Sequence, residues 1–141
     1  MLIALRTGDT ATALAEANST SQTGYKFADV ARLYLSHAPE AELKKAAADL
    51  ELDLRSSHDP EVYYLNATAL SFSKQGHAAI RELRKAIKGN HCSYPNMDKD
   101  PLFDTIRQWP EFSELRQAGM QCQTRFLQNR QQIDTQLQAS N

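Results

Sequence analysis

Two cysteines, Cys92 and Cys122, are the residues of this 141-residue chain best suited to covalent or metal chemistry. Their spacing fits no zinc signature of the CxxC kind. A metal site completed by His91 would have only three soft ligands, so we expect no metal and no cofactor. Two separate thiols remain one interpretation. The other is a disulfide, which requires the last helix to fold back over the loop that holds Cys92.

The histidines and the acidic residues form no catalytic or metal-binding motif. The four histidines lie at the boundaries of predicted helices, where side chains usually face solvent: His37, His58, His77 and His91. The segment with Asp98, Asp100 and Asp104 lacks the glycine and the distal glutamate of a calcium loop. We therefore interpret Asp98 and Asp100 as helix caps. Glycine-rich phosphate loops and nucleophile motifs are also missing from the sequence, so we expect a protein that is not an enzyme.

A stripe of basic residues marks one face of the helix predicted over residues 77–89. Positions three and four apart share a helix face, which aligns Arg81, Arg84, Lys85 and Lys88. This stripe is either a solvated face that complements the helix dipole or a contact for an acidic peptide or partner domain. The whole chain carries 16 basic and 17 acidic residues, a balance that argues against nucleic-acid binding.

Proline and cap residues divide the chain into the helices that must position these side chains. Four prolines fit the first position of a helix: Pro39, Pro60, Pro101 and Pro110. Helices are predicted over residues 9–19, 25–36, 39–55, 60–74, 77–89, 101–108 and 110–136. No segment alternates with period two, so the fold class is all-α. The length fits a single domain covering residues 1–141.

The predicted hairpin turns recur at an interval typical of a known helical repeat. They fall near Gly8, near residues 36–39 and near Gly76, and their average spacing of about 34 residues is the period of tetratricopeptide (TPR) repeats. Residues at the family's large, small and aromatic positions are Leu65, Ala69, Phe72, Ala79, Leu83 and Ala86. The chain thus resembles an α-α superhelix of TPR-like hairpins, with degenerate repeats in residues 1–90. The turn at Gly76 is two residues shorter than in the family, and Thr68 replaces an aliphatic residue.

The segment from residue 91 to residue 141 departs from the repeat. Around Asp100–Phe103 and Pro110–Phe112 it resembles the closing segment of TPR-like regions in bacterial winged-helix regulators and serine/threonine kinases. The resemblance implies a C-terminal helix that caps the stack. It also implies a non-enzymatic protein-interaction or sensory module, taken from a larger bacterial regulatory protein with a further domain upstream.

The resemblance also indicates a binding groove for a protein or peptide partner. In such hairpins the first helix lines the concave face, and the residues that would point there are Tyr63, Asn66, Leu70 and Ser73. An amide can bind a peptide backbone through both its donor and its acceptor, and a tyrosine offers a rigid amphipathic surface. The alternative is that the chain's own closing segment fills this groove.

The last helix carries a heptad-like apolar stripe that offers a different function. Its members are Phe112, Leu115, Gly119, Cys122, Phe126, Ile133 and Leu137. The first half should pack on the core, whereas the second half either frays or pairs with a second molecule. Self-association as a homodimer is therefore one alternative function, and a small-molecule-binding helical pocket is another.

The longest apolar run, Met1–Ala4, is too short to span a bilayer, so we expect no membrane contact by this segment. We expect a cytoplasmic location. A membrane span upstream would make the periplasm the alternative, and that compartment would favour a disulfide.

Overall fold

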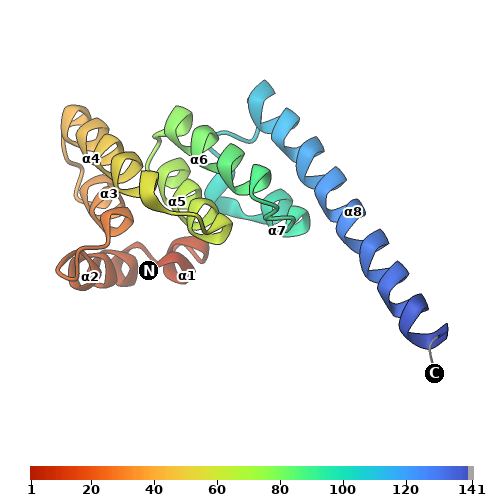
Figure 1. The fold of residues 1–141 in the computed structure, drawn as a ribbon. Coiled ribbons are helices and arrows are strands. Elements are labelled where there is room, and N and C mark those ends of the chain that lie inside the picture. The colour runs from red at the N-terminus through yellow and green to blue at the C-terminus, as the bar shows by residue number, and fades with distance from the viewer. Residues whose placement is uncertain (140–141) are drawn as a thin grey trace.

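The computed structural model describes residues 1–139, and in that range it contains eight α-helices and two 3-10 turns (Figure 1). The α-helices are α1 (Leu2–Arg6), α2 (Thr10–Ser21), α3 (Lys26–Leu35), α4 (Glu40–Asp53), α5 (Pro60–Phe72), α6 (Gly76–Lys88), α7 (Tyr94–Lys99) and α8 (Pro110–Ala139). The 3-10 turns are η1 (Leu54–Ser56) and η2 (Pro101–Phe103). No strand occurs in the described range, so the all-α class is confirmed.

Most helices pack against those that are near them in the sequence. Helix α3 packs between α2 and α4, α5 packs on α6, and the alternate pairs α3 with α5 and α4 with α6 also touch. The largest hydrophobic cluster runs from α3 to α8 and includes Leu50, Leu83 and Phe112. A smaller cluster joins α1, α2 and α3 to Leu102 of the closing segment. The closing segment therefore belongs to both cores.

Residues with left-handed backbone end several of these helices. Gly8 and His37 have φ angles of 76° and 57°, at two of the predicted turns. The third turn differs, because Lys74 takes the left-handed conformation (φ 59°) and Gly76 begins α6 as a buried residue. A Cβ atom on Gly76 would lie 2.4 Å from the ring of Trp109. Glycine is thus required there by close packing against the start of α8.

The helix predicted over residues 101–108 is wrong. Only η2 forms there, followed by turns, and α7 was not predicted. The turns are held because the Arg107 guanidinium donates to the backbone carbonyls of Asp98 and Asp100, at 2.5 and 2.7 Å. The apolar residues of the segment are buried nevertheless: Leu102, Phe103 and Ile106.

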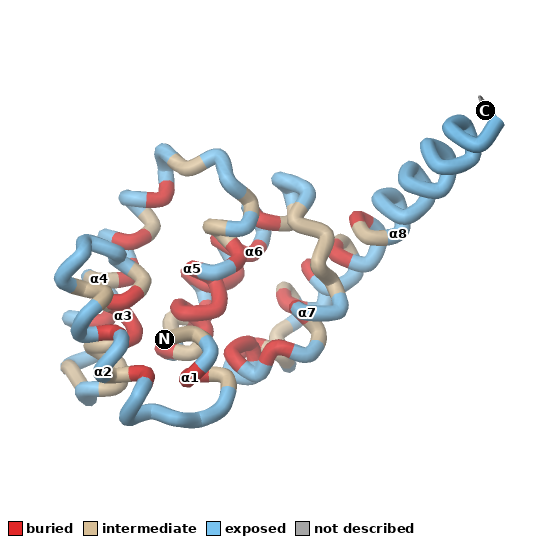
Figure 2. Tube along the Cα trace, turned by 90° about the horizontal axis from the view of Figure 1, so that it is seen from below, coloured by how far each residue is buried: buried red, intermediate tan, exposed pale blue. Residues whose placement is uncertain are grey.

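Helix α8 has two parts with different surroundings. Its buried residues all fall between Phe112 and Cys122, where it packs on α6 and α7. From residue 124 to residue 139 every residue is exposed, and Figure 2 shows this part leading away from the body of the protein. No helix in residues 1–139 is both long enough and apolar enough to cross a membrane.

Candidate functional site

The predicted groove residues do not line an open groove. Asn66 is 5% exposed, and Leu70 and Ser73 are fully buried. Asn66 also donates from its amide to the carbonyl of Val62 at 2.7 Å, and the Tyr63 hydroxyl donates to the carbonyl of Ser57. The prediction that these residues line a groove is therefore corrected for Asn66, Leu70 and Ser73, because neighbouring elements cover the face of α5 that carries them. Tyr63 is half-buried.

The closing segment is one of the elements that cover α5. The Thr105 hydroxyl donates to the carbonyl of Ser71 at 2.7 Å, and the two hydroxyl oxygens lie 2.9 Å apart. Turn η2 packs directly on α5. Leu65, which the TPR alignment places at a large core position, is 37% exposed, and Tyr64 is the buried residue of that turn. The chain's own segment thus occupies part of the surface that the resemblance assigned to a ligand.

The basic stripe on α6 is partly neutralised within the chain. Arg81 forms two hydrogen bonds to the Glu51 carboxylate, at 2.7 and 2.8 Å. Lys85 donates to the buried carboxylate of Glu82 at 2.6 Å and lies 5.5 Å from the centre of the Tyr63 ring. The two other basic residues, Arg84 and Lys88, are exposed and form no ion pair within residues 1–139. Arg84 and Lys88 are therefore the two side chains of the stripe that remain for contact with an acidic partner, and they form only a small surface.

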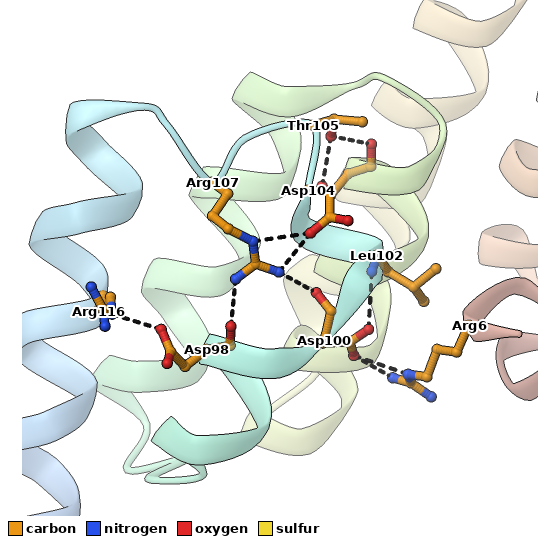
Figure 3. Close-up of polar contacts among 9 residues, drawn as sticks. Arg6, Asp98, Asp100, Leu102, Asp104, Thr105, Arg107 and Arg116 are labelled. Atoms are coloured by element: carbon orange, nitrogen blue, oxygen red, sulfur yellow. Dashed lines mark hydrogen bonds and ion pairs between the residues drawn. The ribbon is translucent and has the colours of Figure 1, made fainter.

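Three arginines hold the acidic residues of the closing segment (Figure 3). Arg6 of α1 donates twice to Asp100, at 3.0 and 2.7 Å, and Asp100 also accepts from the backbone N–H of Leu102 at 3.1 Å. Arg107 pairs with Asp104 at 2.8 Å, and Arg116 of α8 pairs with Asp98 at 2.7 Å. Asp100 therefore caps η2 as predicted, whereas Asp98 lies inside α7 and acts as an ion-pair partner.

This network pairs all three carboxylates of the acidic cluster within the chain. Each of the three carboxylates already has a guanidinium partner, which supplies the positive charge that a metal ion would otherwise bring. No group of three or more metal-ligating side chains is found in the described part of the chain. The same ion pairs connect the closing segment to α1 at one end and to α8 at the other.

A disulfide joins Cys92 and Cys122 across 30 residues of sequence. Cys92 follows the end of α6, and Cys122 is the last buried residue of the α8 stripe. The bond therefore ties α8 to the body at the point where the helix leaves it. Of the two interpretations that the sequence left open, the structure has the one in which α8 folds back over the Cys92 loop.

Beyond this bond, α8 carries four of the nine large hydrophobic residues that are exposed in the described chain. Phe126 is 58% exposed, Ile133 57% and Leu137 61%. Seven and four residues separate them, so they lie on one face, and that face continues the stripe that packs on the body through Phe112 and Cys122. A helical stripe that is buried for half its length and exposed for the rest is typical of an interaction site.

No protein family model, no curated protein and no solved structure matches this chain. The geometry of its own surfaces therefore has to support a function. The groove is closed by the chain itself, and the basic stripe is half neutralised. The part of α8 beyond the disulfide, residues 123–139, leaves an apolar face uncovered.

Proposed function

We propose that this chain is a non-enzymatic protein-interaction module that self-associates through residues 123–139 of α8. The observation that carries the proposal is the exposure of Phe126, Ile133 and Leu137 on one continuous helix face. An isolated helix of this length is marginal in water, so a glutamine-rich projection gains stability from a partner helix. Pairing would bury the apolar stripe and support the helical state together.

The charges on this part of α8 favour an antiparallel pair. It carries two arginines, Arg125 and Arg130, and one acidic residue, Asp134. A parallel pair in register would place Arg130 beside Arg130. An antiparallel pair with Phe126 opposite Leu137 of the second copy brings Arg130 close to Asp134 of that copy, and two-fold symmetry repeats the contact.

The same register fits the length of the exposed segment. With Phe126 opposite Leu137, residue 124 faces residue 139, so the overlap covers the exposed half of α8 and stops at the body of each copy. Ile133 lies near the centre, beside the aliphatic stem of Arg130 of the second copy. The disulfide at Cys122 holds the base of the helix in place. Charge, length and attachment thus support one arrangement.

We also propose that the module works in an oxidising compartment such as the periplasm, as part of a larger bacterial regulatory protein. A disulfide persists in such compartments and is rare in the cytoplasm. This location replaces the cytoplasmic one expected from the sequence. Dimerisation of the module would bring together the domains attached to it.

Analytical ultracentrifugation tests the pairing directly. The wild-type chain should sediment as a dimer in a concentration-dependent manner, and Phe126→Ser/Ile133→Ser should sediment as a monomer with unchanged melting of the body. A charge swap tests the antiparallel register. Arg130→Asp alone and Asp134→Arg alone should weaken the dimer, and the two changes together should restore the dimer. Arg84→Glu, at an exposed position of α6, is the matched control. A wild-type chain that stays monomeric at high concentration would refute self-association. If the double swap does not restore the dimer, the antiparallel register is refuted.

A further inference from the structure

A cleft of about 450 Å³ opens where α1, α5, the loop after α6 and the α7–η2 segment meet. The closing segment forms one wall and α5 forms the other, and the ion pair between Arg6 and Asp100 joins α1 to the closing segment. The cleft exists because residues 91–103 fold back onto the N-terminal helices. Its polar lining includes Arg6, Glu61, Tyr64, His91, Asn96, Lys99 and Asp100.

Two buried polar atoms on the cleft wall have no hydrogen-bond partner within residues 1–139. They are the hydroxyl of Tyr64 and Nε2 of His91. Tyr64 is only 6% exposed, and its ring stacks on the His91 imidazole with the ring centres 4.5 Å apart. Burial raises the pKa of Tyr64 and lowers the pKa of His91, so both are neutral at pH 7. Since unsatisfied buried polar groups are costly, this pair indicates a polar ligand.

Charges of both signs line this cleft. Arg6 uses Nε and Nη2 to bind Asp100, which leaves its Nη1 without a hydrogen bond in the described range. Lys99, which also lines the cleft, forms no ion pair within residues 1–139. Glu61 lies one helical turn before Tyr64 and acts electrostatically on His91. Because the Asp100 carboxylate neutralises Arg6, the charges without an ion-pair partner in the described range are Lys99 and Glu61, which have opposite signs.

We infer that this cleft binds a small zwitterion, with the ligand's carboxylate toward Arg6 and Lys99 and its ammonium group toward Glu61. The Tyr64 hydroxyl, which has no partner within residues 1–139, donates a hydrogen bond to the ligand. A dipeptide, whose ammonium and carboxylate groups stand at its two ends, belongs to this chemical class. The site is independent of pairing through α8, since none of these residues belongs to that helix.

Titration of the full ¹⁵N-labelled chain, followed by amide chemical shifts, tests this site. The probes are L-alanyl-L-alanine, its N-acetyl derivative and its C-terminal amide. The free dipeptide should shift the amides of the cleft in a saturable way, and removing either charge should weaken binding about tenfold, the effect of one charge-assisted hydrogen bond.

Two variants locate each end of the ligand. Glu61→Gln should abolish the preference for the free amino group and keep the preference for the free carboxylate, and Lys99→Gln should do the reverse. Both residues are exposed at the rim, so both variants should fold. Lys88→Gln, on the surface of α6, is the matched control and should change neither preference. Equal binding of the three probes, no saturable shifts, or shifts confined to other surfaces would overturn the inference.

Discussion

The two halves of α8 carry apolar residues on one shared face and have opposite surroundings. Between Phe112 and Cys122 the stripe is buried against α6 and α7, whereas between Phe126 and Leu137 it faces solvent. The stripe continues past the point where the burial ends, although it becomes sparser and Asn129 occupies one of its positions. A heptad-like repeat therefore specifies that a face will be covered, and the rest of the chain decides whether its own body or another molecule covers it.

The largest effect should come from truncating the buried half. Phe112 is almost fully buried and packs against Phe103, with ring centres 5.6 Å apart. Phe112→Ala should lower the free energy of unfolding by about 3–5 kcal/mol, because a large side chain leaves a cavity. Phe126→Ala, measured under monomeric conditions by urea denaturation, should cost less than about 0.5 kcal/mol. Similar losses of unfolding free energy in both variants would show that the two halves of the stripe do not differ in burial.

The disulfide should contribute the next largest effect. Its loss by reduction, or in Cys92→Ser/Cys122→Ser, should lower the free energy of unfolding by about 3 kcal/mol, because the unfolded chain regains the freedom of a 30-residue loop. Denaturation with and without a reductant measures this. The serine variant is the control, since a reductant should not affect it; a reductant effect of equal size there would indicate another cause.

Gly76 tests the anchoring of the start of α8. Gly76→Ala should destabilise the fold by about 1–3 kcal/mol, because the new methyl group would overlap the Trp109 ring. Gly76→Ala combined with Trp109→Leu should lose less than the sum of the single changes, as expected for residues in contact. If thermal melts show that the two losses of stability are additive, the Trp109 ring does not pack against Gly76.

Removing the exposed end of α8 should have a small effect on folding. A chain that ends at Phe126 should keep its melting temperature under dilute conditions, because none of residues 124–139 is buried. It should lose self-association.

Removing the whole closing segment should have the opposite result. A chain that ends before Pro101 should fail to fold cooperatively, since Leu102, Phe103 and Phe112 would all be missing from the cores. A soluble, cooperatively melting chain of residues 1–100 would contradict the role of the closing segment.

The smallest effect should be a pH dependence at His91. Burial lowers the pKa of this imidazole in the folded state, so the unfolded state binds protons more readily. The contribution of His91 to stability is therefore present above its unfolded pKa of about 6.5 and falls as the pH is lowered through that value. The stability difference between wild type and His91→Gln should shrink from pH 7 to pH 5. A stability difference that stays constant from pH 7 to pH 5 would contradict this.

Helix positions followed from the sequence wherever local signals decide them. Prolines at the start of α5 and α8 and the apolar spacing of α6 gave those helices nearly to the residue, and Leu83 is buried as its spacing predicts. The region from 91 to 109 did not follow, because Arg107 and Thr105 fix its turns through contacts with distant backbone carbonyls. Such long-range hydrogen bonds leave no periodic pattern in the sequence.

The candidate sites were predicted less well than the helices. Position within a hairpin suggested that Asn66 and Ser73 were exposed, but it could not show that the closing segment and neighbouring helices cover α5. The cleft between α5 and the closing segment was missed because three of its lining residues, Arg6, Tyr64 and Lys99, lie far apart in the chain and meet only after folding. The stripe on α8 was the exception, since a single helix carries all its residues.

The disulfide attaches α8 to the body at Cys122, so the exposed end of the helix can move as a rigid arm about that point. From Cys122 to Ala139 the helix extends about 25 Å, so a rotation of about 10° at its base moves the tip by about 4 Å. The Cys92–Cys122 bond lies at the base, where a small angular freedom has the largest effect at the tip. Reducing the bond would leave the arm itself unchanged and widen the region of space that its tip explores.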